Sequence, residues 1–138
     1  MKVVLTALAL AFVAGPALAA SKPAPPPELQ SVRKALAAAV KARDMKAAAA
    51  LARFPLDNSA YQAPDKISKT EFLSSGYDLF GSGDKKLLKC LATGAFEHQS
   101  GQLDFPGSPW LIDCDGNEFF FGLVNGKWRL TSLMNVNE

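Results

Sequence analysis

The sequence has few of the residues from which metal and catalytic sites are most often built. It contains two cysteines, Cys90 and Cys114, and one histidine, His98. Together they supply at most three zinc ligands, and His98 lacks the close ligand spacing of zinc sites, so we expect no bound metal or other cofactor. The cysteines are too far apart for a C-x-x-C redox motif. A Ser-His-Asp set is assembled only by folding, and no nucleophile–base pair can be recognised in the sequence.

The sequence also lacks a hydrophobic run long enough to cross a membrane. The apolar run Val3–Ala14 has about 12 residues, whereas a spanning helix needs about 20. Lys2 precedes this run and Ala17-Leu18-Ala19 follows it as a small-x-small cleavage site, which is typical of a secretory signal peptide. No cysteine lies near the cleavage site to carry a lipid. We therefore expect a signal peptide at residues 1–20, no membrane span, and a periplasmic or secreted protein.

Neither sign of charge dominates the chain, whose formal net charge is +2. Basic residues gather early and acidic residues late in the sequence. They are Arg33, Lys34, Lys41, Arg43, Lys46 and Arg53, and then Asp104, Asp113, Asp115 and Glu118. We interpret these groups as two solvated faces, because a nucleic-acid surface usually has a larger basic excess and interleaved aromatic residues. No nucleic-acid partner is expected.

The rest of the chain is long enough for one domain with a modest core. Residues 21–27 hold four prolines and predict an extended lead that cannot fold by itself. Residues 28–138 are then the single domain. Its first part has the apolar periodicity and capping signals of helices. The predicted helices are Glu28–Ala42, Met45–Arg53, Lys69–Phe80 and Lys85–Ala92.

Two details refine this prediction. Ser68-Lys69-Thr70-Glu71 is a capping box, in which the serine hydroxyl and the glutamate each satisfy a backbone donor. Gly76 lies inside the third predicted helix, which indicates that another backbone packs closely there. Between the second and third helices, the prolines in Phe54–Ala63 allow only a short strand or an irregular edge.

From Ala95 onward the pattern changes to that of strands. Asp115-Gly116 and Asn125-Gly126 are typical of two-residue turns and predict two consecutive hairpins. The predicted strands are Phe96–Gln99, a weak Gln102–Phe105, Trp110–Cys114, Asn117–Val124 and Lys127–Val136.

Two-residue turns also predict the register of these hairpins. Leu123 should lie opposite Trp128, Phe121 opposite Leu130, and Phe119 opposite Ser132. The predicted core face then carries Trp110, Ile112, Cys114, Phe119, Phe121, Leu123, Trp128 and Leu130. The opposite face carries Leu111, Asp113, Glu118, Phe120, Arg129, Thr131 and Leu133. Cys114 should face the helices that carry Cys90, so an exported chain with two cysteines is expected to form a Cys90–Cys114 disulfide.

The order of elements resembles the nuclear-transport-factor-2-like superfamily. The resemblance lies in helices first, an Ala42-Arg43-Asp44 junction, and a late sheet that ends in Asn125-Gly126-Lys127-Trp128-Arg129-Leu130. Phe54-Pro55-Leu56, Ile67–Phe72 and Leu111–Gly122 look like the pattern of small exported bacterial proteins of that superfamily. The resemblance implies an α+β fold in which N-terminal helices pack on a strongly bent antiparallel sheet, shaped like a cone around a pocket. None of these motifs is catalytic.

We therefore expect a non-catalytic module that binds a small apolar or amphipathic ligand, or that acts as an accessory subunit of an envelope protein. The predicted pocket is lined by Tyr77, Trp110, Ile112, Phe119, Phe121 and Trp128. One alternative is a small isomerase or hydratase that uses Asp113 or His98; another is an inhibitor or immunity-type interaction protein. A homodimer through Leu111, Phe120 and Leu133 on the outer sheet face is also predicted.

Overall fold

The computed structural model of the chain describes residues 23–58, 66–99 and 105–136. The predicted signal peptide and residues 102–104 of the weakest predicted strand lie outside these ranges. Helices and strands are both present, which confirms the α+β class. The helices are α1 (Pro27–Lys41), α2 (Met45–Ala50), α3 (Lys69–Leu79), the short 3-10 helix η1 (Gly81–Gly83) and α4 (Lys85–Thr93). The strands are β1 (Ala52–Asn58), β2 (Lys66–Ile67), β3 (Glu97–His98), β4 (Trp110–Cys114), β5 (Asn117–Val124) and β6 (Lys127–Asn135).

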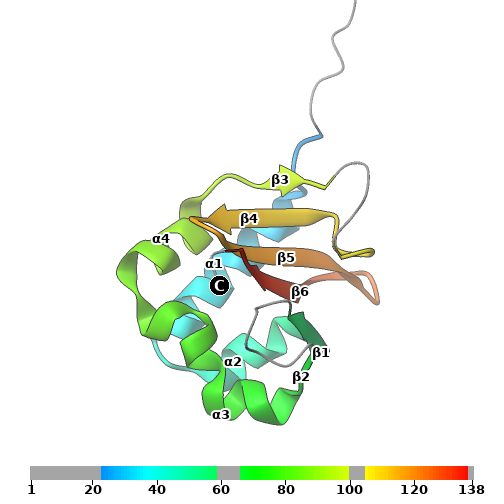
Figure 1. Cartoon of the computed structure of the whole chain (residues 1–138). Helices are drawn as coiled ribbons and strands as arrows, with labels where there is room; N and C mark the ends of the chain where they lie inside the picture. Colours follow the sequence, from blue (N-terminus) through cyan, green and yellow to red (C-terminus); the bar gives the residue numbers. More distant parts are fainter. Residues whose placement is uncertain (1–22, 59–65, 100–104, 137–138) are drawn as a thin grey trace, which may run out of the picture.

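The six described strands form one open sheet in the order β2-β1-β6-β5-β4-β3. Neighbouring strands are antiparallel except β1 and β6, which run parallel, so the sheet is mixed and the expectation of a purely antiparallel sheet is wrong. In Figure 1, α1 passes behind the sheet, α4 lies at its left-hand end, and α2 and α3 lie below it. The cone shape implied by the superfamily resemblance stays a prediction.

The predicted starts of α2, α3 and α4 are confirmed, and each has a side-chain cap. The Ser68 hydroxyl accepts a hydrogen bond from the Glu71 backbone N–H at 3.1 Å, and the Glu71 carboxylate accepts one from the Ser68 N–H at 2.7 Å. Asp84 caps α4 by accepting from the Leu87 N–H at 2.8 Å. Pro27 occupies the first turn of α1, where its missing N–H costs no hydrogen bond. None of the described helices is long and apolar enough to cross a membrane.

Gly76 does face close neighbours, but they are side chains and not a backbone. A Cβ at this position would lie 3.1 Å from the Met45 Cε atom of α2 and 3.2 Å from the Phe72 ring. The glycine therefore makes room for a methionine of the neighbouring helix.

The second helix ends earlier than its alanine-rich sequence predicts. It stops at Ala50, and Arg53 belongs instead to β1. Strand pairing outweighs local helix propensity here, because the Leu130 N–H of β6 donates to the Leu51 carbonyl and the Arg53 side chain donates to the Thr131 carbonyl. Neither partner is near Arg53 in sequence, so the helix signal alone could not indicate the strand.

Both predicted hairpins are present, and the register of the second changes partway along it. Leu123 lies opposite Trp128 and Phe121 opposite Leu130, as predicted. Beyond them Phe120 pairs with Ser132, so Thr131 is an extra residue that forms a β-bulge. The prediction that Phe119 pairs with Ser132 is therefore wrong.

The bulge exchanges the faces of the residues that follow it. Phe119 lies opposite Leu133, and Leu133 is buried in the core instead of lying on the outer face. Most of the predicted core face is confirmed. Its buried members are Trp110, Ile112, Cys114, Phe119, Phe121 and Leu130. Leu123 is an exception, because it lies near the end of the hairpin and is 57% exposed.

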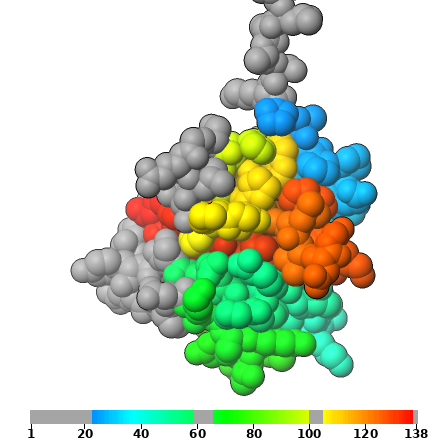
Figure 2. Space-filling view, turned by 90° about the vertical axis from the view of Figure 1, so that its right-hand side faces the viewer, coloured from blue at the N-terminus to red at the C-terminus, as the bar shows by residue number. Residues whose placement is uncertain are grey.

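The outer face of the sheet is covered by the chain itself. The Phe105 ring meets the Phe120 ring edge-on at 4.8 Å, and Ser108 contacts the hydroxyls of Thr131 and Ser132. A Cβ on Gly122 would overlap the Gly107 carbonyl oxygen, so this glycine is what lets the segment lie flat on the strand. Figure 2 shows yellow residues of this part of the chain directly against the orange and red residues of β5 and β6.

This cover bears on the predicted homodimer. Leu111, Phe120 and Leu133, the three residues that suggested it, are all buried within one chain. The homodimer through this face stays a prediction, but these three apolar residues no longer support it.

Candidate functional site: a lysine-lined groove

Four of the six residues predicted to line a pocket pack against other core side chains instead. Trp110, Ile112, Phe119 and Phe121 are at most 5% exposed and belong to the core cluster. The Phe119 ring stacks on Phe80 at 5.6 Å. Filling the space under the sheet with rings leaves little room there for a ligand.

The other two are half-buried at the edge of the core. Tyr77 lies under the Arg43 guanidinium, whose carbon is 4.7 Å from the ring centroid. Trp128 lies on β6, opposite the exposed Leu123. The structure does not bring Tyr77 and Trp128 together with the other four around any described cavity.

Phe119 does line one described cavity, of about 280 Å³. Asp78 and Leu79 of α3 contribute to its walls, as do Leu133 and Asn135 of β6. Asp78 accepts a hydrogen bond from the Ser82 hydroxyl at 2.8 Å, which gives it a local structural role. The cavity is smaller than the roughly 300–1,000 Å³ of most small-molecule sites.

The two candidate catalytic residues do not form a pair. His98 is exposed on β3, and its ring meets Trp110 edge-on at 4.8 Å. Asp113 is exposed on β4, three residues after Trp110. This separation places it about 10 Å from Trp110 along the strand. Its carboxylate accepts from the Gly116 N–H at 2.8 Å and so closes the hairpin turn. The groove beside it is lined by charged residues, by Leu87 and by the disulfide.

The largest of the described cavities is a groove of about 720 Å³ between α1 and α4. We call it the α1–α4 groove. The buried residues Ala37 and Leu88 form its floor, and lysines from both helices stand along its walls. The residues that line it are Lys34, Ala37, Ala38, Lys41, Gly83, Lys85, Leu88, Lys89 and Ala92.

The two helices contribute residues at the same spacing. On α1 the lining positions are 34, 37, 38 and 41, and on α4 they are 85, 88, 89 and 92. Each set follows the i, i+3, i+4, i+7 pattern, which places four residues in one stripe along a helix. The groove is therefore two helical stripes side by side.

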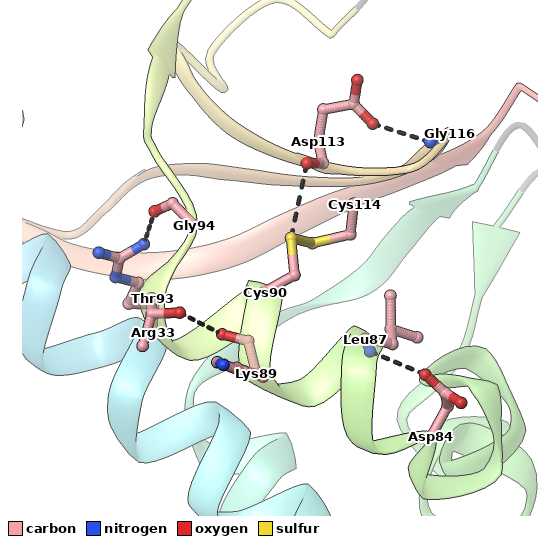
Figure 3. The surroundings of a disulfide bond; sticks show 10 residues. All are labelled: Arg33, Asp84, Leu87, Lys89, Cys90, Thr93, Gly94, Asp113, Cys114 and Gly116. Atoms are coloured by element: carbon pink, nitrogen blue, oxygen red, sulfur yellow. Dashed lines mark hydrogen bonds between the residues drawn. A yellow bond between two sulfur atoms is a disulfide. The ribbon is translucent and has the colours of Figure 1, made fainter.

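The helices run in opposite directions along the groove. Arg33, early in α1, donates a hydrogen bond to the carbonyl of Gly94, just after α4 ends. At the other end, Lys41 of α1 lines the groove together with Gly83, just before α4 begins. Figure 3 shows Arg33 reaching from α1 to Gly94.

Arg33 is buried although it carries a charge. It is 7% exposed, its guanidinium carbon lies 4.6 Å from the centroid of the Phe96 ring, and burial lowers its pKa from the usual value. Its Nε has no hydrogen-bond partner among the described residues. The contacts with Gly94 and Phe96 hold the start of α1 against the chain that leaves α4.

The other wall of the groove is held by the disulfide. Cys90 of α4 and Cys114 of β4 are bonded, with Cα atoms 5.8 Å apart, as the sequence predicts. The Cys90 sulfur also lies 3.5 Å from the Asp113 carbonyl oxygen (Figure 3). A covalent bond to the sheet fixes α4 at the residue directly after the groove residue Lys89 and two residues before Ala92.

The groove is strongly basic. Lys34, Lys41, Lys85 and Lys89 are all exposed, and none of the described residues that line the groove is acidic. Positive charges that face one concave surface add their potentials and attract anions. Leu88 and Ala37, which are 7% and 5% exposed, provide an apolar floor beneath these charges. The groove can therefore hold a group that is apolar on one side and anionic at its edges.

Sequence reasoning missed this site for a clear reason. Lys34 and Lys41 were part of a basic group interpreted as a solvated face, and Lys85 and Lys89 lie far along the chain. The one signal that could have joined them is the matching spacing of the two stripes.

Comparisons with known protein families, with curated proteins and with solved structures find no match to this chain. The described residues contain no group of three or more histidine, cysteine, aspartate or glutamate side chains that could hold a metal ion.

Proposed function

We propose that the protein is an exported, non-catalytic accessory module of the nuclear-transport-factor-2-like superfamily that binds an anionic, amphipathic partner in the α1–α4 groove. The observation that carries this proposal is the pairing of an apolar floor with four exposed lysines and no described acidic lining residue. The proposed binding site therefore lies on the surface of the helices, whereas the sequence predicted it in the core under the sheet.

The way the groove is built supports binding. Its two walls are both fixed near the end where α1 begins and α4 ends, one by Arg33 on Gly94 and the other by the Cys90–Cys114 bond. A surface that is already ordered loses little conformational entropy when it binds. The disulfide also suits an oxidising compartment, in agreement with the predicted signal peptide.

The test uses an anionic amphiphilic dye, 8-anilinonaphthalene-1-sulfonate, and the neutral apolar dye Nile red. We expect the anionic dye to bind saturably to the disulfide-bonded protein, more weakly as salt is raised, and Nile red to bind far less. Lys34→Glu/Lys89→Glu should abolish the saturable signal, because it replaces attraction by repulsion on both walls.

Lys46→Glu/Lys127→Glu is the matched control. It makes the same change in net charge at two exposed lysines that do not line the groove. Circular dichroism checks that both variants are folded. Absence of saturable binding, or an equal loss in both variants, would show that the groove is not the site.

A further inference from the structure

We propose that the occupant of the α1–α4 groove is an amphipathic, acidic α-helix of a partner protein. This inference rests on the proposed function and names the kind of partner that the groove fits.

The lysines extend along the groove instead of gathering at one end. Lys34 and Lys41 are two helical turns apart on α1, or about 10 Å, and Lys85 and Lys89 are one turn apart on α4, or about 6 Å. A single-chain lipid has one anionic head, so it would neutralise one end and leave the remaining ammonium groups beside its hydrocarbon chain. The distribution of charge thus favours an occupant with carboxylates along both of its edges.

The floor is suited to the close approach of a helix. Three of the residues that line the groove are alanines, the buried Ala37, the partly buried Ala92 and the exposed Ala38, and their side chains are small. Helices pack by placing the side-chain ridge of one in the groove of another, at an axial distance of about 8–10 Å that small residues shorten. Leu88 offers a larger apolar contact in the middle of this floor.

The spacing of the two stripes also matches what a helix presents. Helix-in-groove recognition uses anchors at i, i+3, i+4 and i+7 of the bound helix. Both walls repeat that spacing, so a third helix would place an apolar stripe on the floor and glutamates or aspartates beside the lysines. A slim dianionic molecule could span the lysines but would leave most of the 720 Å³ unfilled.

The test measures binding of a synthetic peptide of about 18 residues, long enough to form a helix. It carries leucines at i, i+3, i+4 and i+7 with glutamates on both sides of that stripe. A second peptide has the same composition in an order that destroys the stripe. Fluorescence anisotropy gives the affinity, and amide chemical shifts of the labelled protein locate the site.

We expect the amphipathic peptide to bind saturably and to shift the amides of Ala37, Ala38 and Ala92. Lys34→Glu/Lys89→Glu should weaken it by about tenfold or more, since two exposed ion pairs become repulsive, and Lys46→Glu/Lys127→Glu should leave it unchanged. Equal binding of the two peptides would overturn the inference, because charge alone would then account for the affinity.

Laurate, a single-chain fatty acid, separates this inference from the proposed function. If laurate binds in the groove with the same dependence on the lysines and the amphipathic peptide does not, the helical partner is wrong and the proposed function stands. If neither laurate, the anionic dye nor the peptide binds, both proposals fail.

Discussion

The Thr131 hydroxyl donates a hydrogen bond to the Phe120 carbonyl oxygen across the β5–β6 pair, at 3.2 Å. Thr131 is the extra residue of the bulge, and its oxygen also lies 2.6 Å from the Ser108 hydroxyl. Because the threonine proton goes to Phe120, Ser108 is the donor in the second bond. One buried hydroxyl therefore joins the bulge to the segment that covers the outer sheet face.

Replacing this hydroxyl by a methyl group should destabilise the protein. Thr131→Val keeps the shape of the side chain but removes the nearer partner of the buried Ser108 hydroxyl, which is left with only the Ser132 hydroxyl at 3.4 Å. We expect the free energy of unfolding to fall by about 1–3 kcal/mol, which is the usual cost when a buried polar group loses its hydrogen-bond partner. Urea denaturation measures it.

Thr93→Val is the control for this substitution, because the Thr93 hydroxyl bonds a helix carbonyl at an exposed position. Its effect should stay within about 0.5 kcal/mol. If the two variants lose similar amounts, the hydrogen bonds of Thr131 do not fasten the covering segment.

Removing the Cys90–Cys114 bond should cost much of the stability. The cysteines are 24 residues apart, and closing such a loop stabilises a protein by roughly 3–4 kcal/mol in the chain-entropy model. Cys90→Ser and Cys114→Ser should lose similar amounts, and the double variant little more than either, since each single change already breaks the bond. Denaturation under non-reducing conditions measures the three losses.

The same experiment has a second readout. Intact-mass analysis of the protein under non-reducing conditions should find no free thiol, and adding a reductant should reduce the stability of the natural sequence but not that of the double variant. Two free thiols, or single losses that simply add, would contradict the bond.

Glu71 should make the stability depend on acidic pH. Hydrogen bonds from the Ser68 backbone N–H, and then from its side chain, lower the pKa of Glu71 in the folded protein. The folded state therefore holds this proton less tightly than the unfolded chain does. The stabilisation is fully present above the ordinary glutamate pKa and is lost as the pH falls through the lowered one.

Unfolding of the natural sequence and of Glu71→Gln, compared from neutral to acidic pH, measures this dependence. The glutamine can still accept the Ser68 N–H but cannot ionise. Its stability should fall less steeply across the acidic range, and parallel curves would show that the capping carboxylate does not contribute.

Much of the local structure could be predicted from the sequence because its causes are local. The capping box at Ser68, the Asp84 cap and the two-residue turns each depend on a few neighbouring residues. The disulfide could be predicted because the hairpin register placed Cys114 on the face that meets the helices. Those predictions needed no knowledge of the rest of the fold.

What could not be predicted depends on contacts between distant segments. The helix signal near Arg53 gives way to pairing with β6, and the bulge at Thr131 is stabilised by Ser108 from another segment. The α1–α4 groove likewise depends on how two helices from different parts of the chain lie together, so its lysines gave no common signal. Four of the six predicted pocket residues lie in the core, because apolar side chains on an inner sheet face pack first against one another.

The place of β6 in the sheet has a consequence for how the protein folds. It comes last among the described strands, yet it lies between β1 and β5 and is the parallel partner of β1. Pairings between segments so distant in sequence form slowly, because a long loop must close before they yield any contact. Until β6 has been synthesised, β1 and β5 both expose unpaired edges that invite association with other chains. The sheet can therefore be completed only late in folding. A chain truncated before Lys127 would lack the strand that joins β2 and β1 to β5, β4 and β3.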